Sequence, residues 1–391
     1  MKHKKTIFRS LCVLAVLLCV CLQTGAQTKA VEDMDSIEIG LVTCSPHNEV
    51  YSLYGHSALH VHDLRHDRHL VYNYGVFDFR KPHFVWRFIM GQTDYRLECY
   101  SDYERWANYY KKWGCKMEEQ VLNLTNEEKL RLIKALEENL HNYPVYRYNF
   151  FFDNCCTRPR DIVERCLDGK VSYAARPDYN PTFREMIHAC TKDHPWAAFG
   201  NDLLLGLRAD LKTTQREQEF LPDNLCYDFD HATVVRQGET RPLVLRHVVT
   251  APLRQQPVSG GFPLSPLACT LFILLISIGI FVLEWRRGRT FVWWDALLML
   301  LTGLPGMLLL LMFFSEHPAT STNLQILLLN PVALLFIPSV LRRRRTRWFT
   351  ISLFCLIAFF VGGIWQDYAE GMELVALSLL LRYWIHRRHD K

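Results

Sequence analysis

The strongest constraint on this 391-residue chain is that its two parts suit different solvents. Residues 27–262 are largely polar, whereas residues 267–385 are mostly apolar and are interrupted only by short charged loops. A helix needs about 20 residues to cross the hydrocarbon core of a bilayer, and the apolar part has room for several such helices. We therefore expect a polar domain followed by an all-helical membrane domain.

The apolar part divides into five candidate spans. The fifth is the weakest, because it is short and carries Glu373 and Arg382. Charged residues are costly at the centre of a bilayer. The expected spans are residues 267–283, 293–314, 324–341, 348–365 and 371–385.

Basic residues predict the orientation of these spans. Arginines follow the first, third and fifth spans, while the loops 315–323 and 366–370 contain no Lys or Arg. Cytoplasmic loops carry an excess of Lys and Arg, so the C-terminus is expected in the cytoplasm and the polar domain outside it. The net charge of +5 comes largely from these inner loops, so it gives no reason to expect a nucleic-acid partner.

The N-terminal 26 residues are typical of a secretory signal. Lysines come first, an apolar run covers 11–22, and Thr24, Gly25 and Ala26 supply small residues near a cleavage point. An uncleaved anchor is the alternative. We expect this domain order: signal 1–26, catalytic domain 27–200, peripheral segment and tether 201–265, membrane domain 266–386 and cytoplasmic tail 387–391.

The polar domain mixes strand and helix patterns. Thr125 and Glu128 have the spacing of a capping box, which predicts a helix to about residue 140. Alternation and β-branched residues predict strands, with a turn at 64–68 between two of them. Together these patterns predict an α+β domain. The expected strands are 36–43, 57–63, 69–74 and 116–124, and the other expected helices are 83–90, 102–113 and 159–167.

The most informative residues are His56 and Cys155. His56 lies in the motif Tyr-Gly-His-Ser-Ala, and Cys155 lies in Asp-Asn-Cys-Cys-Thr-Arg. Asp153 and Asn154 are good N-cap residues, so we expect Cys155 in the first turn of the helix that follows. A thiol becomes a good nucleophile when a base is near, and the positive end of a helix dipole lowers its pKa further. We therefore expect Cys155 as nucleophile and His56 as base. A purely structural or disulfide-bonded cysteine is the alternative.

Histidine precedes cysteine here, which is the reverse of papain-like enzymes. That permuted order resembles the circularly permuted papain-like group that contains the lecithin:retinol acyltransferases. Four short sequence motifs make the resemblance more specific, to the Lnb family of bacterial lipoprotein N-acyltransferases. One departure is Cys156, which stands where that family usually has threonine. The words that carry the resemblance are Leu-Val-Thr-Cys-Ser-Pro (41–46), Tyr-Ser-Leu-Tyr-Gly-His-Ser-Ala (51–58), Tyr-Gly-Val-Phe-Asp-Phe (74–79) and Asp-Asn-Cys (153–155).

The resemblance implies a reaction and its partners. Cys155 would take an acyl chain from a phospholipid as a thioester and pass it to the α-amine of the lipidated N-terminal cysteine of a lipoprotein. The expected partners are therefore a phospholipid donor and diacylglyceryl-modified lipoproteins in the bacterial inner membrane, with no cofactor. The alternatives are a membrane-anchored cell-wall thiol peptidase or amidase, and a non-enzymatic membrane interaction protein.

Other site residues are less closely determined by the sequence. The residue that orients His56 is expected among His60, Asn73 and Tyr74, on neighbouring strand positions. An oxyanion hole would use the backbone N–H of Cys155 with support from Asn154 or Tyr54.

Substrate-binding candidates lie in both domains. Arg158 and Arg160 can hold a phosphate head group, although a surface salt bridge is an equal alternative. His317, Asn323 and Asn330 are polar residues near membrane depth, where polar groups usually face a cavity or cap a helix. We expect them to line the path of the acyl donor.

Cysteines and histidines leave two questions open. Some of six cysteines in the exported domain could pair in an oxidising compartment: Cys44, Cys99, Cys115, Cys166, Cys190 and Cys226. The dense histidines at 60, 62, 66 and 69 could bind zinc through an i, i+2 pair on one face of a strand. A solvated turn at 64–68 is the simpler interpretation, and we expect no metal.

Overall fold

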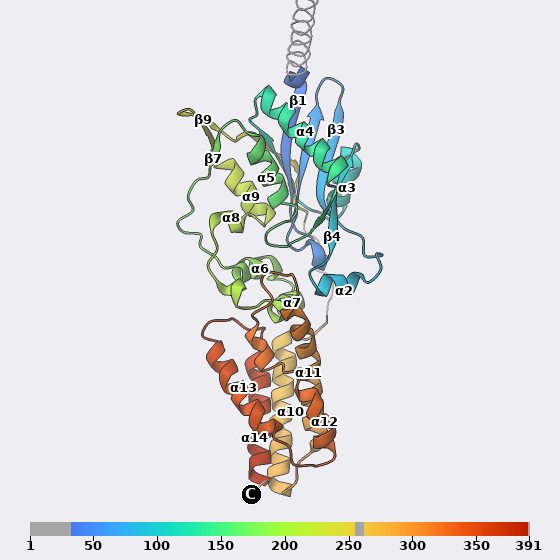
Figure 1. Cartoon of the computed structure of the whole chain (residues 1–391), viewed down its shortest axis with the longest axis vertical. Helices are drawn as coiled ribbons and strands as arrows, with labels where there is room; N and C mark the ends of the chain where they lie inside the picture. The colour runs from blue at the N-terminus through green and yellow to red at the C-terminus, as the bar shows by residue number, and fades with distance from the viewer. Residues whose placement is uncertain (1–32, 255–261, 390–391) are drawn as a thin grey trace, which may run out of the picture.

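The computed structural model describes residues 33–254 and 262–389. A sheet-rich N-terminal domain stands on a helical C-terminal domain, with α6 (Phe183–Thr191) and α7 (Pro195–Leu204) lying between the two (Figure 1). The predicted signal, residues 1–26, lies outside the described residues.

The N-terminal domain is built on a seven-stranded antiparallel sheet. The strand order is β10-β5-β1-β2-β3-β4-β6, so the predicted hairpin of β2 and β3 lies near its centre. Two short 3-10 turns, η1 (Asp33–Ser36) and η2 (Val50–Ser52), flank β1. The strands are β1 (Ile37–Cys44), β2 (His56–Asp63), β3 (Arg68–Val76), β4 (Asp94–Tyr100), β5 (Met117–Leu122), β6 (Val145–Arg147) and β10 (Val244–Ala251).

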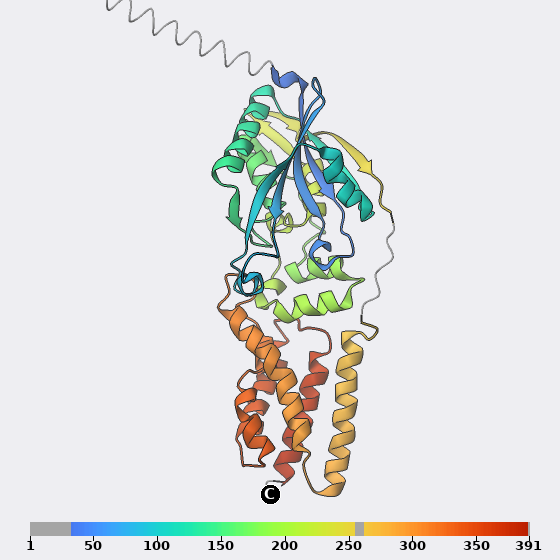
Figure 2. The same cartoon turned by 90° about the vertical axis from the view of Figure 1, so that its right-hand side faces the viewer.

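Alternate residues of these strands build two cores on opposite faces. On one face Leu41 packs in a cluster with residues of α4 (Asn126–Asn142) and α5 (Thr157–Cys166). On the other face Val42 packs in a cluster with Trp106 of α3 (Tyr103–Lys112). This period of two is what a sheet covered on both faces requires. Figure 2 shows the sheet edge-on, with helices on each side.

The sequence predictions of these elements are confirmed with small shifts. The capping box of Thr125 and Glu128 opens α4, and Asp102 caps α3 by accepting a hydrogen bond from the backbone of Arg105. The predicted helix 83–90 is α2 (Phe84–Ile89). Strands β4 and β6 were not predicted from the sequence.

The segment expected to be peripheral is better ordered than predicted. Strand β10 pairs with β5 in the main sheet, and Leu225 and Phe229 lie in its core. The chain after residue 200 therefore contributes a strand and core side chains to the N-terminal domain. The remaining elements here are β7 (Lys170–Ser172), α6 (Phe183–Thr191), α7 (Pro195–Leu204), η3 (Leu207–Asp210), α8 (Gln215–Gln218), α9 (Pro222–Asp230), β8 (Thr233–Arg236) and β9 (Glu239–Pro242).

The C-terminal domain has two described helices that are long and apolar enough to cross a membrane, α10 (Pro266–Arg287) and α11 (Val292–Phe313). The fourth predicted span is the shorter apolar helix α13 (Trp348–Gly362), and the fifth is α14 (Met372–His389).

The third predicted span is not one helix. Its first part is the 3-10 turn η4 (Leu324–Leu327), its last part is the short helix α12 (Ala333–Leu341), and an irregular stretch separates them. Asn330 opens the second part by accepting a hydrogen bond from the backbone of Val332 at 3.0 Å. Gly306 of α11 permits the close approach, because a Cβ there would lie 2.1 Å from the carbonyl oxygen of Leu329.

Buried charges join α10, α11 and α14 near the ends of these helices that lie away from the N-terminal domain (Figure 1). Arg382 forms ion pairs with Glu284 and, at 2.6 Å, with Asp295, and His386 contacts the second oxygen of Asp295 at 2.9 Å. The side chains of Arg382, Glu284 and Asp295 are at most 2% exposed. Each charge is therefore paired, as burial requires.

Hydrogen bonds between backbone and amide groups tie the two domains together. The N–H groups of Gly206 and Leu207 donate to the carbonyls of Ala319 and Thr322 at 2.7 and 2.8 Å. Gln325 donates its side-chain amide to the carbonyl of Asp202 at 2.8 Å. The upper end of the membrane domain is thus fixed against the segment that follows α7.

The described cysteines are all free thiols. Ten were found in the described ranges, and they include the six for which pairing was considered.

Candidate active site

Three side chains from separate elements meet at one edge of the sheet. His56 is the first residue of β2, Asn73 lies in β3, and Cys155 comes two residues before α5 begins. Gly55, with φ +76°, turns the chain into β2, and an added Cβ there would lie 2.8 Å from the carbonyl oxygen of Cys44. This turn directs His56 into the domain interior.

Asn73 orients the imidazole of His56. Its Oδ1 lies 2.5 Å from Nε2 of His56. Because an amide oxygen can only accept, Nε2 carries the proton and Nδ1 is left as the basic nitrogen. The ring of Tyr110 stacks on the imidazole at 5.9 Å between centroids, which fixes the plane of the ring.

The loop before α5 is held by Asn154. Its Oδ1 accepts from the backbone N–H groups of Cys156 and Thr157 at 2.8 and 3.0 Å. Its Nδ2 donates to the carbonyls of Phe150 and Phe220, both at 2.8 Å. The Asn154 amide is therefore fully used in supporting the Cys155 loop, and the residue at the N-cap of α5 is Cys156.

The surroundings shift the pKa values of the two adjacent thiols in opposite directions. Hydrogen bonding from the Cys156 thiol, together with the His56 charge and the Ser57 backbone N–H, holds the pKa of Cys155 well below its usual value despite burial. Burial raises the pKa of Cys156 well above its usual value. The Sγ atoms lie 4.0 Å apart. The surroundings thus favour ionisation of Cys155 over ionisation of Cys156, which is a buried donor.

The pKa of His56 is raised above its usual value. Burial alone would lower it, but the Cys155 thiolate and the hydrogen bond to Asn73 outweigh burial. A lowered thiol pKa beside a raised imidazole pKa describes a thiolate–imidazolium pair. Such a pair can perform nucleophilic attack followed by proton donation to the leaving group.

Sequence reasoning missed three residues at this site. Ser57 supplies a backbone N–H to Cys155 and places its Oγ 3.5 Å from the Sγ of Cys156. Gly75, with φ +89°, leaves space beside the thiol, since a Cβ there would lie 3.5 Å from Cβ of Cys155. Tyr110 lies on α3, where the apolar stripe of Tyr103, Trp106 and Tyr110 was the available signal.

The pair faces a large cavity of about 1300 Å³ between the two domains. This is above the usual range of about 300–1,000 Å³ for small-molecule pockets. His56, Asn73 and Cys155 belong to its lining, and the loop after α11 contributes His317, Pro318, Ala319 and Thr320. The walls are mainly aromatic: Tyr51, Phe77, Phe84, Tyr95, Tyr148 and Phe150.

Of the other predicted catalytic residues, the structure places two away from His56. His60 lies four residues along β2, about 13 Å away at strand spacing, and contacts Glu119 and His69. The hydroxyl of Tyr74 accepts a hydrogen bond from Asn139. Tyr54 lines the cavity, where its hydroxyl accepts from Asn201 at 2.7 Å.

The two predicted phosphate-binding arginines are engaged elsewhere. Arg158 forms a two-point ion pair with Asp153, and Arg160 is buried against Glu219 at 2.8 Å. Neither belongs to the cavity lining. Among the described residues, the lining of this cavity contains one basic side chain of the Lys or Arg type, that of Arg105.

The three polar residues that were expected to line the path of the acyl donor, His317, Asn323 and Asn330, lie in three different environments. His317 lines the cavity, where its Nε2 donates to the carbonyl of Phe88 at 2.8 Å. Asn323 lies in the domain junction and donates to the carbonyl of Leu203 at 2.8 Å. Asn330 caps the second half of the broken third span.

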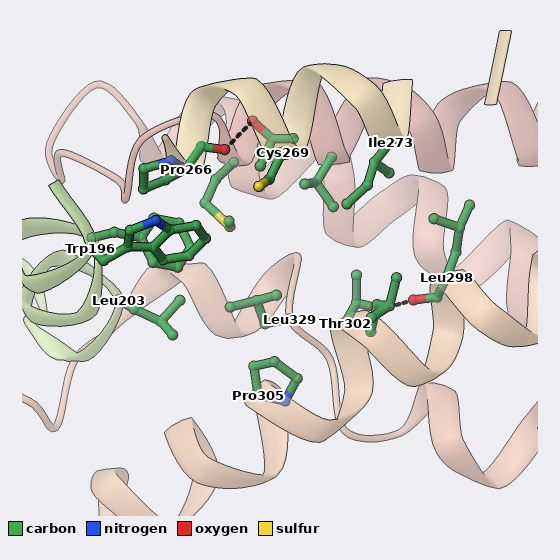
Figure 3. Close-up of a pocket in the computed structure, with 14 residues that line it drawn as sticks. Trp196, Leu203, Pro266, Cys269, Ile273, Leu298, Thr302, Pro305 and Leu329 are labelled. Carbon is green, nitrogen blue, oxygen red and sulfur yellow. Dashed lines mark hydrogen bonds between the residues drawn. The ribbon is translucent and has the colours of Figure 1, made fainter. Parts of the chain in front are cut away.

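A second, smaller cavity of about 210 Å³ lies among the apolar helices (Figure 3). Its lining comes from α7, α10, α11 and α14, including Trp196, Leu203, Ile273 and Leu298. The hydroxyl of Thr302 is turned back to the carbonyl of Leu298 at 2.8 Å. The wall is therefore apolar almost throughout, which suits a hydrocarbon chain.

Comparisons with known proteins identify the family in both domains. The family model described as the Lnb N-terminal periplasmic domain matches residues 26–189. The model described as the Lnb transmembrane domain matches residues 257–391. No curated protein and no solved structure matches the chain.

The two matches follow one another in the order of the two domains and together cover most of the chain. They agree with the sheet-rich domain that carries Cys155 and with the apolar helices below it. The chain belongs to the Lnb family, as a membrane protein with a periplasmic N-terminal domain.

Proposed function

We propose that this protein is a lipoprotein N-acyltransferase of the bacterial inner membrane, with a permuted papain-like catalytic domain in the periplasm and its C-terminus in the cytoplasm. The observation that carries the proposal is the Cys155–His56–Asn73 set in the wall of a cavity to which the membrane domain also contributes lining residues. A soluble substrate would not require such a membrane-fixed cavity.

The reaction has two balanced steps. The Cys155 thiolate attacks an ester carbonyl of a phospholipid, a C–S bond forms, and the C–O bond breaks as the His56 imidazolium protonates the leaving oxygen. The α-amine of a diacylglyceryl-modified cysteine then attacks the thioester. A C–N bond forms, the C–S bond breaks, and His56 takes the amine proton. The products are a lysophospholipid and an N-acylated lipoprotein.

Backbone groups are placed to assist this chemistry. The N–H groups of Cys155 and Ser57 lie beside the thiol, so they are the proposed oxyanion donors. The amide of Asn154 holds the loop that presents the N–H of Cys155, while the N–H of Ser57 comes from β2. Arg105, on the cavity wall, is the proposed contact for the phosphate of a head group, in place of Arg158 and Arg160.

An exposed apolar lip supports access from the bilayer. Phe79, Val85, Trp86 and Phe88 lie on and beside α2, and Val85 is 71% exposed. Arg80 and Lys81 are exposed next to them. Hydrogen bonds attach α2 to the loop after α11, where Glu316 donates its N–H to the carbonyl of Met90 at 3.0 Å. Aromatic and basic side chains together favour a membrane–water interface.

The proposal is tested by mass spectrometry of the N-terminal lipopeptide of an abundant lipoprotein. Cells would carry the intact protein, Cys155→Ala or Cys156→Thr at equal protein levels. We expect the amide-linked acyl chain to disappear with Cys155→Ala and to persist with Cys156→Thr. Unchanged N-acylation in Cys155→Ala would remove lipoproteins as acceptor and favour a cell-wall peptidase or amidase instead.

A further inference from the structure

A group of histidines at the outer end of the β2–β3 hairpin has the arrangement of a metal site. His62 and His69 face each other across the two strands, and their rings stack at 4.0 Å between centroids. Asp67, in the turn between the strands, has φ +49° and places Oδ1 3.3 Å from Nε2 of each ring. All three ligand atoms lie within 4.8 Å of one another.

These distances match what a metal ion requires. Two ligand atoms that are each about 2.0–2.1 Å from a zinc ion at a tetrahedral angle are about 3.3 Å apart. Imidazole nitrogens and a carboxylate oxygen are ligands that suit Zn²⁺. The side chains of His62 and His69 are 23% and 28% exposed, so an ion and a water ligand can reach the site.

A second group of residues contacts the ring nitrogen of His69 that faces away from Asp67. Nδ1 of His69 lies 2.9 Å from Nε2 of His60, and Nδ1 of His60 lies 2.7 Å from the carboxylate of Glu119. Glu119 reaches His60 across β1 at Gly40, which is directly opposite His60 in the strand register. A Cβ at Gly40 would lie 2.5 Å from Oε1 of Glu119, so the missing side chain makes this contact possible.

Counting protons along this row of contacts leaves the last contact without a donor, a deficit that either an added proton or a metal ion can remove. Three contacts join Glu119 to His60, His60 to His69, and His69 to Asp67. Two neutral imidazoles supply only two N–H donors, and ionised carboxylates supply none. If His69 donates to His60 and His60 donates to Glu119, the lone pair of His69 Nε2 faces the Asp67 carboxylate. A metal ion between them resolves the conflict, and His62 adds a third ligand.

We propose that His62, Asp67 and His69 bind one divalent transition-metal ion of the zinc class, with His60 and Glu119 as positioning residues. A ligand histidine usually donates its second ring N–H to an outer group that fixes its orientation, and here His60, held by Glu119, is that group for His69. The ion clamps the outer end of the strands whose inner ends carry His56 and Asn73. Tyr103 of α3 stacks on His60, while Tyr110 of the same helix stacks on His56. The clamp therefore supports the frame of the active site from about 20 Å away.

The test uses the full-length protein in detergent after removal of metal with a chelator. Titration with Zn²⁺ alone, followed by calorimetry and elemental analysis, should give one equivalent per chain. Zn²⁺ should also raise the thermal unfolding midpoint, because it binds the folded state. Replacement of zinc by Co²⁺ should give the visible absorption of a tetrahedral complex.

Variants identify the ligands. His62→Ala and His69→Ala should lose the bound equivalent, and Glu119→Gln should weaken binding about 10- to 100-fold. The matched control is His66→Ala, since His66 is paired with Asp63 in the same turn. If an alanine variant does not fold, Asp67→Asn, on an exposed side chain, keeps the shape and should still lose binding. Absence of binding by the intact protein, or equal binding by His66→Ala and His69→Ala, would overturn the proposal.

Discussion

Nε2 of His56 lies 2.5 Å from Oδ1 of Asn73, a residue seventeen positions later on the neighbouring strand. The contact assigns the proton of the imidazole to Nε2 and leaves Nδ1 for Cys155. The orientation of the base is therefore built into the sheet itself, independently of the helix that carries the cysteine.

The Asn73 contact predicts a specific kinetic defect. Asn73→Ala should lower kcat about 10- to 10³-fold with little change in KM, because a misoriented tautomer slows proton transfer without altering substrate binding. Loss of the bond should also lower the pKa of His56, which Asn73 helps to raise. The activity–pH profile of the variant should shift to lower pH on its basic side. Tyr74→Phe is the control, since its hydroxyl bonds to Asn139 instead.

The thiolate–imidazolium pair predicts reactivity at low pH. Because the pKa of Cys155 is lowered, alkylation of Cys155 should persist well below the ordinary thiol pKa of about 8.5. Because the pKa of His56 is raised, the imidazolium form should extend above its usual range before activity falls. Peptide mass spectrometry after iodoacetamide treatment across pH would measure this. Alkylation of Cys156 in preference to Cys155 would contradict the assignment.

The apolar lip predicts a defect that depends on the membrane. Val85→Asp combined with Trp86→Ser should reduce acyl transfer from phospholipid bilayers about tenfold or more, because a charge at the interface opposes insertion. Acyl-enzyme formation from a short, water-soluble thioester should stay normal. Leu64→Asp is the matched control, because Leu64 is 51% exposed at the opposite end of the domain. Equal losses on both donors would show that the double variant disturbs the site itself.

The close contact at the domain junction predicts that alanine will affect stability differently at Gly206 and at Gly200. A Cβ at Gly206 would lie 2.3 Å from the carbonyl oxygen of Thr322, so Gly206→Ala should cost about 1–3 kcal/mol and separate the domains. Gly200 lies in α7 with no atom within 4 Å of the corresponding position. Gly200→Ala should be neutral or stabilising by up to about 1 kcal/mol. Thermal unfolding of both variants, followed by limited proteolysis at the junction, would test the difference.

The buried cluster around Arg382 predicts the largest stability loss. Arg382→Leu would leave Glu284 buried without a cation and Asp295 with only His386 as partner, which costs about 3–5 kcal/mol. Adding Glu284→Gln and Asp295→Asn should recover a large part of this loss, since no buried charge then remains unpaired. Arg387→Ala, on the exposed side of α14, is the control. Detergent thermostability of the four proteins is the measurement.

The sequence predicted those parts of the fold that depend on local chemistry. Alternation revealed β1, β2 and β3, and the Thr125 capping box revealed α4. Strand β10 was missed because its outward residues, such as Leu245 and Val249, are exposed and do not alternate with polar ones. Its place in the sheet depends on pairing with β5, more than 100 residues earlier, which no local pattern records.

Some residues of the candidate site were predicted from their local sequence, and others were not. Cys155 and His56 were evident from their surrounding words, and Asn73 was among three candidates for the orienting residue. The three could not be separated from sequence, because the choice depends on which residues of β3 share a face with His56. The guanidinium groups of Arg158 and Arg160 lie next to the nucleophile in sequence, but folding pairs them with Asp153 and Glu219.

The position of Arg382 in the chain has a consequence for how the protein is made. Its two carboxylate partners precede it by 98 and 87 residues, so α10 and α11 leave the ribosome long before their cation is synthesised. Glu284 and Asp295 therefore lack their ion-pair partner until the final helix is translated. Arrival of α14 completes the bundle, so a chain that ends early is left with an exposed ionic defect that cellular quality control can recognise.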